Sequence, residues 1–303
     1  MTPRGRGAYI ETKAFKNACL SSHPPMSARR ARSINRKGSD VTDFEALSVR
    51  HADDICVITL NRPELLNRFD AQLETELTEV LTSLHSPSDV RVAVLLAQGK
   101  VFSAGGDFEM MLECNVNIEE RLAALQRARE LLAAITSLPI PLITGVHGAA
   151  IGLGATVAAG SDVVVASANA KIADTHVAVG LAAGDGGALF WPQAVGSMRA
   201  RRYLLTGEPL PAGKAYDFGL VTDLVDDPAD VEQAAMAIAA TIAALPPLGV
   251  RGTKAALNQL TQQRAGEVVE TALLWSGMTL GSADLAEAVT SFKEKRAGKY
   301  EGR

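Results

Sequence analysis

Apolar and polar residues alternate in blocks along most of the chain, and each block has the period of a strand or of a helix. Residues 46–60 form two alternating runs around a polar turn at residues 52–54, which predicts a β-hairpin. Residues 90–96 and 163–167 are short apolar runs typical of buried strands, whereas residues 118–137 carry apolar side chains at helical spacing. Strands that alternate with helices in this way indicate a parallel sheet covered by helices.

Helical patterns dominate the last third of the chain. Residues 198–225 predict a helix, a turn, a second helix and one further strand. Residues 230–244 form an alanine-rich helix that ends before two prolines, and helical spacing continues to residue 292. We therefore expect an α/β chain whose folded core spans residues 41–225 and whose helical C-terminal region, residues 226–303, packs on another surface.

The first 40 residues differ from the rest. They carry nine Lys and Arg residues against Glu11 and Asp40, with Ser, Gly and Pro between them and no sustained apolar period, which predicts a disordered basic extension. This composition also fits an organelle transit peptide, and a true start at Met26 explains it equally well. We expect a cytoplasmic protein, or one of the mitochondrial matrix if the extension is a transit peptide.

Composition narrows the classes of function. Of the 303 residues, 47% are hydrophobic but only 5% aromatic, which predicts a globular core built from Ala, Val and Leu. The net charge of -4 provides no broad basic field for nucleic acid, and no apolar run approaches the roughly 18 residues that a membrane span needs. The scattered cysteines, with no CxxC pair and no His at ligand spacing, predict a reducing compartment and no metal site; they are Cys19, Cys56 and Cys114.

Two glycine-rich turns follow apolar strands. The first is FSAGGD at residues 102–107, and the second, GAAIGLG at residues 148–154, opens an alanine-rich helix. A helix that begins at such a turn directs unpaired backbone N–H groups and the positive end of its dipole at whatever lies in front of it. Two such ends are what a two-donor oxyanion hole requires, although both could simply be tight turns.

Four motifs in order resemble the enoyl-CoA hydratase/isomerase (crotonase) family over roughly residues 44–303: NRPELLN, FSAGGD, GAAIGLGATVAAGSDVVVAS and SFKEKRAGKY. The resemblance implies a spiral core of ββα repeats and a C-terminal region that assembles a homotrimer or a dimer of trimers. It also implies an acyl-CoA substrate and no separate cofactor, because CoA enters as part of the substrate. In the family the thioester carbonyl lies between two backbone N–H groups, which by motif are those of Ala104 and Leu153.

The chain departs from the family at the reacting groups. Hydratases of the family add water with two glutamates, and this chain has Thr156 and His176 at those positions. Thr156 is no base near neutral pH, whereas a histidine with an ordinary pKa of about 6.5 can be one. The run HVAVGLAAGDGGALFWP also resembles the loop of 6-oxocamphor hydrolase, a relative that cleaves a C–C bond in a β-diketone. That resemblance makes His176 the base that activates water and Asp185 its partner.

The separation of nine residues lets the loop fold back, so that the His176 imidazole and the Asp185 carboxylate reach hydrogen-bond distance beside the oxyanion hole. The carboxylate would raise the pKa of the imidazole and leave its other ring nitrogen free to take a proton from water. Structural roles are the alternative: a hydrogen-bonded loop histidine, and an aspartate that caps the next helix.

The NRPELLN segment resembles the family's turn that contacts CoA, which places Arg62, Leu65 and Arg68 near the ligand. Lys295 could meet the CoA phosphates, as could the neighbouring Lys293 and Lys299, although lysines near a chain end usually form a solvated face. The other residues expected around the substrate belong to the two glycine turns and the reactive loop: Ser103, Gly105, Gly106, Asp107, Gly152, Thr156 and Trp191.

The sequence is compatible with three functions, of which we expect the first, with the second as the alternative for the type of reaction. The first is an enzyme of acyl-CoA metabolism in which the oxyanion hole stabilises an enolate and a His/Asp pair replaces the two glutamates. The second is a hydrolase that cleaves a C–C bond of a β-diketone or a β-ketoacyl-CoA. The third is a non-catalytic protein that binds CoA esters. Some relatives bind RNA, but the folded part of this chain lacks a stripe of Lys and Arg.

Overall fold

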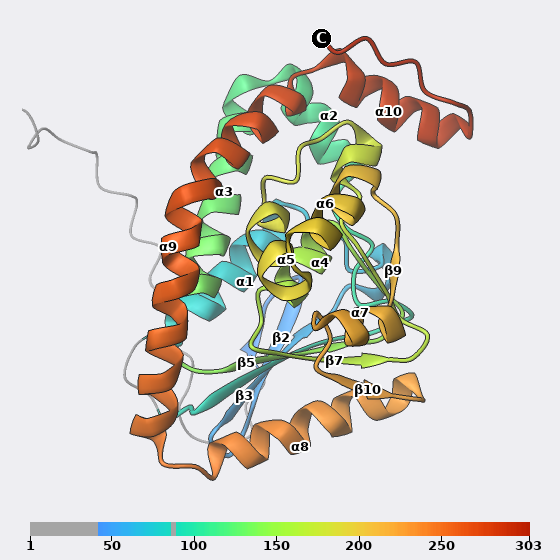
Figure 1. The fold of residues 1–303 in the computed structure, drawn as a ribbon. Helices are drawn as coiled ribbons and strands as arrows, with labels where there is room; N and C mark the ends of the chain where they lie inside the picture. Colours follow the sequence, from blue (N-terminus) through green and yellow to red (C-terminus); the bar gives the residue numbers. More distant parts are fainter. Residues whose placement is uncertain (1–41, 86–88) are drawn as a thin grey trace, which may run out of the picture. The chain divides into compact units, whose positions relative to one another are not determined.

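The computed structural model describes residues 42–85 and 89–303, and the predicted extension at residues 1–40 lies outside them. In this range the main sheet has the strand order β1-β2-β3-β4-β5-β7-β10 (Figure 1). The first three strands pair antiparallel and the other neighbours pair parallel. The strands are β1 (Thr42–Asp43), β2 (Leu47–Ala52), β3 (Ile55–Leu60), β4 (Val92–Ala97), β5 (Leu142–Val146), β7 (Val163–Ser167) and β10 (Asp223–Val225).

A second, smaller sheet positions the glycine-rich turns. Its order is β6-β8-β9, and its strands are β6 (Ala149–Ile151), β8 (Lys171–Ala173) and β9 (Leu210–Pro211). β6 pairs in parallel with β8, with Ile151 opposite Ala173, so the chain leaves both strands side by side at the same edge. A bridge between Ser103 and Ala150 brings the FSAGGD turn to this edge as well.

The helices of the described range are α1 (Ala71–Ser83), α2 (Phe108–Val116), α3 (Ile118–Ser137), α4 (Leu153–Ala159), α5 (Gly187–Val195), α6 (Ser197–Thr206), α7 (Ala212–Phe218), α8 (Val231–Ala243), α9 (Pro247–Leu280) and α10 (Ala283–Glu294). Short 3-10 turns are η1 (Pro63–Leu65), η2 (His176–Val179) and η3 (Pro228–Asp230). The long helix α9 runs alongside α3 (Figure 1). Among the described residues, no single helix is long and apolar enough to cross a membrane; α8 and α9 meet that length and composition together only across a 110° bend.

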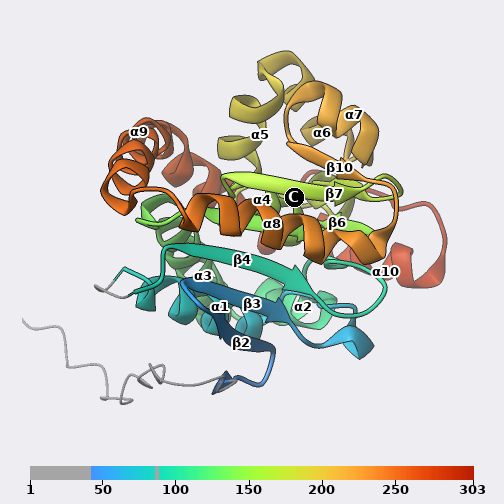
Figure 2. The same ribbon diagram turned by 90° about the horizontal axis from the view of Figure 1, so that it is seen from below.

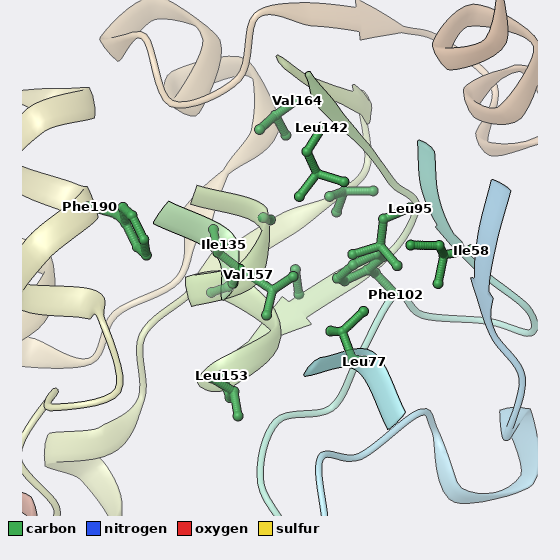
Figure 3. Packing of buried hydrophobic residues seen from close by; sticks show 14 of the residues in the cluster. Ile58, Leu77, Leu95, Phe102, Ile135, Leu142, Leu153, Val157, Val164 and Phe190 are labelled. Atoms are coloured by element: carbon green, nitrogen blue, oxygen red, sulfur yellow. The ribbon is translucent and has the colours of Figure 1, made fainter. Parts of the chain in front are cut away.

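The two faces of the main sheet have separate apolar cores because successive side chains of a strand point to opposite faces. Val57 of β3 packs on Ala235 of α8, which covers one face (Figure 2). Ile58 points the other way, into a larger cluster shared with α1, α3 and α4. Figure 3 shows this larger cluster, to which α4 contributes Leu153 and Val157. The first turn of α4 is therefore fixed by packing.

Most elements predicted from the sequence are confirmed. The hairpin is β2 and β3, joined at Asp53, whose φ of 52° lies in the left-handed region. The helix predicted at residues 118–137 is α3, and the strand predicted at residues 90–96 is β4, shifted toward the C-terminus. The helical C-terminal region is broken at Gly281, where α9 ends before α10 begins.

Candidate functional site

The second glycine-rich turn presents a backbone donor at the start of α4. Gly152 is the N-cap of this helix, with φ 53° and ψ −123°, a conformation that favours glycine. Its own N–H donates to the Ala173 carbonyl at 2.8 Å, which ties the turn to β8. The next N–H, that of Leu153, belongs to the first residue of the helix and has no hydrogen-bond partner among the described residues. Leu153 is therefore placed as the sequence predicts.

In the FSAGGD turn the donor is one that the sequence analysis did not choose. The N–H of Ala104 donates to the Leu66 carbonyl at 3.0 Å, so the prediction of Ala104 as an oxyanion donor is wrong. Phe69 forms a parallel bridge with Gly106, through hydrogen bonds that involve the residues on either side of Gly106. In such a bridge the N–H of the central residue points away from its partner strand.

Gly106 and Leu153 meet at one cavity. The N–H of Gly106 has no hydrogen-bond partner in the part of the chain that the structure describes. A Cβ atom built on Gly152 would lie 3.9 Å from this nitrogen, which shows how closely the two turns approach. Both Gly106 and Leu153 line a cavity of about 90 Å³, together with His176 and Asp185. Two residues whose N–H groups have no hydrogen-bond partner in the described part of the chain thus line the same cavity.

Four polar side chains form a chain of hydrogen bonds beside these donors. His176 Nε2 lies 2.9 Å from Asp185 Oδ2, which confirms the predicted contact between them. His176 Nδ1 lies 2.6 Å from Oδ1 of Asp174, a residue that the sequence analysis missed although it stands two positions before the histidine. Thr156 Oγ1 donates to Asp185 Oδ1 at 3.1 Å. Asp185 does not cap the following helix, whose N-cap is Gly186.

The imidazole therefore lies between two carboxylates, and the expected free ring nitrogen is absent in this arrangement. Burial alone would lower the pKa of His176, but the charges of Asp185 and Asp174 and the hydrogen bonds to both outweigh it and hold the pKa well above its ordinary value. A ring that donates through both nitrogens carries a positive charge. Both ring nitrogens of His176 thus face carboxylates in this structure, and the role of base expected for His176 stays a prediction.

This raised pKa has a measurable consequence for stability. Because the pKa of His176 is higher in the folded state than its unfolded value of about 6.5, the protonated ring stabilises the fold fully below about pH 6.5. That contribution is lost as the pH rises through the raised folded-state pKa. Urea unfolding of the wild type and of His176→Asn should give a free-energy difference that shrinks toward high pH, whereas a difference that grows would contradict the charged ring.

The same three side chains could also be considered as metal ligands. One ligand atom each of Asp174, His176 and Asp185 lie within 4.8 Å of one another. The two carboxylates, however, face opposite nitrogens of one ring at 2.6 and 2.9 Å. Ligands of one ion converge on a shared point, so this geometry favours proton-mediated contacts over coordination.

Several predicted binding residues serve the turns themselves. Arg62 forms a bidentate ion pair with Asp70, at 2.7 Å for both bonds, and also donates to the Arg68 carbonyl, so its guanidinium holds the NRPELLN turn. Ser103 is buried, and its Oγ donates to the Asn67 carbonyl at 2.8 Å. Gly105, with φ 95°, accepts the Phe69 N–H through its carbonyl. These residues shape the site through the backbone.

The remaining predictions fall into two groups. Trp191 is fully buried against Tyr203 and is not among the residues that line the cavity, so its prediction as a substrate contact is wrong. Others lie at the surface or near it: Leu65 is partly buried in η1, Arg68 pairs with Asp107 at 3.0 Å, and Lys295 is exposed at the end of α10. The pair of Lys293 and Glu109, at 2.6 Å, is also exposed.

Comparison with known proteins agrees with this fold. The family model described as enoyl-CoA hydratase/isomerase matches residues 50–303. (E)-benzylidenesuccinyl-CoA hydratase of Thauera aromatica is 33% identical over 253 residues, which cover 83% of this chain and 97% of that protein.

Two solved structures are similar as well. An enoyl-CoA hydratase/isomerase from Mycobacterium paratuberculosis has 34% identity and a TM-score of 0.79, with 82% of this chain and 100% of that chain covered. A β-diketone hydrolase from the cyanobacterium Anabaena, bound to (S)-3-oxocyclohexyl acetic acid, has 26% identity and a TM-score of 0.71, with 78% and 95% covered.

Proposed function

We propose that this chain, which belongs to the enoyl-CoA hydratase/isomerase family, acts on an acyl-CoA thioester by stabilising an enolate in an oxyanion hole formed by Gly106 and Leu153. The observation that carries the proposal is that both N–H groups lack partners among the described residues and line the same cavity as His176 and Asp185. Donors preorganised in this way can each stabilise a developing oxyanion by about 3 kcal/mol. CoA enters as part of the substrate, and the trimeric assembly stays a prediction.

In this proposal the His176 and Asp185 side chains handle the proton. Asp174 is almost completely buried and forms a hydrogen bond with Nδ1 of the His176 ring, whereas Asp185 lines the cavity. A carboxylate has about four lone-pair positions, so Asp185 can still accept a proton from water or from the acidic carbon while it bonds Nε2 and Thr156. The His176 imidazolium supplies the proton that the enolate carbon takes up at the end of the reaction.

A C–C bond hydrolase is the second candidate, and the His176 and Asp185 pair is the observation that favours it. In that reaction water, deprotonated by Asp185, attacks one carbonyl of a β-dicarbonyl substrate. The bond to the central carbon breaks, the electron pair leaves as an enolate held by Gly106 and Leu153, and His176 protonates that carbon. The similar Anabaena structure is named a β-diketone hydrolase.

One screen separates the candidates. The protein is incubated with crotonyl-CoA, acetoacetyl-CoA and a cyclic β-diketone, and both binding and product formation are measured. Turnover of a CoA ester supports the first proposal, and turnover of the free diketone alone supports the second. Tight binding of CoA esters without turnover of any substrate would contradict both and leave a binding protein.

Hydration of crotonyl-CoA is expected to be slower than in a two-glutamate relative by about 10²-fold or more, because Thr156 supplies no proton-transfer group. Thr156 is fully buried and is bonded to Asp185, so it supports that carboxylate and does not activate water itself. The loss of absorbance of the enoyl thioester measures the rate, with the relative assayed in parallel. Fast hydration that survives His176→Ala would overturn the assignment of the proton-handling pair.

A further inference from the structure

The cavity contains one buried carboxylate that the proposed reaction does not use. Glu74 lies in α1, is 6% exposed, and lines the same cavity as Gly106 and Leu153. Its Oε2 accepts a long hydrogen bond from Arg127 Nε of α3, at 3.3 Å. Its Oε1 has no hydrogen-bond partner among the described residues. Nothing in the pattern of this amphipathic helix distinguishes Glu74 from its other glutamates.

The surroundings of Glu74 make this carboxylate unusual. The cavity wall formed by α2 and α3 is apolar or sulfur-containing, with Met110, Met111, Cys114 and Leu125. Burial, which outweighs the attraction of Arg127, and repulsion from Asp185 and Asp70 together raise the pKa of Glu74 to about 7. Glu74 thus places a carboxyl group beside the apolar and sulfur-containing side chains of α2 and α3.

A polar group in such a place discriminates between ligands. While the cavity holds water, Oε1 can form a hydrogen bond with that water. A purely hydrocarbon acyl chain would displace the water and offer Oε1 no hydrogen bond in its place. A chain that carries oxygen at the right position restores the bond. Sites that hold an unpaired polar group reject ligands lacking the complementary group far more strongly than apolar sites reject an extra methylene.

We propose that Glu74 is a specificity-determining residue that selects acyl chains with a hydroxyl or oxo oxygen beyond the two carbons next to the thioester. Glu74 comes from α1, whereas the reactive loop supplies His176 and Asp185, and all three residues line the same cavity. Met110 and Met111 can adapt their flexible side chains to the rest of such a chain. The inference rests on the proposed function, because it needs the thioester carbonyl at Gly106 and Leu153.

Matched CoA esters test this selection. Calorimetry at pH 7 compares pentanoyl-CoA with 4-hydroxy-, 5-hydroxy- and 4-oxopentanoyl-CoA on the full chain. The wild type is expected to bind at least one oxygen-bearing ester about tenfold or more tightly than pentanoyl-CoA. Glu74→Leu should remove that preference and strengthen the binding of pentanoyl-CoA. Glu79→Gln is the control, because Glu79 lies in the same helix but is exposed, and it should behave as the wild type.

Folding of the variant is checked by its melting temperature, since Glu74→Leu leaves Arg127 without its partner in a largely buried position. The double variant with Arg127→Met removes both charges and gives the same comparison of esters if the single variant unfolds. Equal affinity of the wild type for all four esters, or a preference that survives in the folded Glu74→Leu or double variant, would overturn this inference alone. Binding of none of the esters would overturn the proposed function, and this inference with it.

Discussion

His176→Ala is expected to lower kcat for the preferred ester by about two or more orders of magnitude, because it removes the acid of the proposed pair. Asp185→Asn should lower kcat by a comparable factor, since an amide cannot take a proton from water or carbon. The double variant should be little worse than either single variant, because residues that act as a unit lose their shared function only once. Steady-state kinetics at saturating ester measures all three.

A third variant tests Asp174, whose carboxylate contacts the His176 imidazole and is not among the residues that line the cavity. Asp174→Asn should lower kcat and shift the high-pH limb of the pH profile toward lower pH, because one of the two charges that hold the proton on His176 is removed. Unchanged ester affinity and an unchanged far-ultraviolet spectrum are the controls for each variant. If the losses in kcat multiply in the double variant His176→Ala/Asp185→Asn, His176 and Asp185 act independently.

Leu153→Pro is expected to lower kcat by about 10² to 10³-fold, because it deletes one N–H of the oxyanion hole and no other hydrogen bond. Proline is suited to this position, since Leu153 is the first residue of α4, where the N–H has no partner within the helix. The variant also loses the leucine side chain, which lines the cavity.

Leu153→Ala is the matched control for that loss, because it truncates the side chain and keeps the N–H. Its kcat should stay within about tenfold of the wild type, well above that of the proline variant. Circular dichroism and the melting temperature show whether α4 still forms. Equal activity of the proline and alanine variants would mean that the Leu153 N–H binds no reacting oxygen.

The contrast between Leu153 and Ala104 shows what the sequence could predict. The glycine turn before α4 is a local feature, so the family motif carries over directly to Leu153, whose N–H is among the first of the helix and has no partner within it. In FSAGGD the direction of each N–H depends on pairing with the segment around Phe69, which lies more than thirty residues away in the sequence. Nothing local in the motif reveals that Ala104 donates to Leu66 and leaves Gly106 as the donor.

The side-chain contacts of the site also divide into those that the local sequence predicts and those that it does not. The nine-residue loop between His176 and Asp185 made their contact predictable, whereas the contact of Asp174 with the same ring depends on the local backbone after β8, which the sequence pattern did not indicate. Trp191 looked like part of the reactive loop, yet α5 turns it into the core against Tyr203. Glu74 was unpredictable from its helix, because burial of a carboxylate depends on what α2 and α3 place around it.

The pairing of β6 with β8 divides the site by chemical kind. The groups proposed to hold the oxygen are main chain: the Leu153 N–H follows the ladder between Ile151 and Ala173, and the direction of the Gly106 N–H is set by the bridge to Phe69. The part that moves protons consists of side chains on the segments leaving those strands, and a point mutation can replace them without altering the ladder. Substitution of these side chains can therefore change the proposed proton transfer while the main-chain donors stay in place.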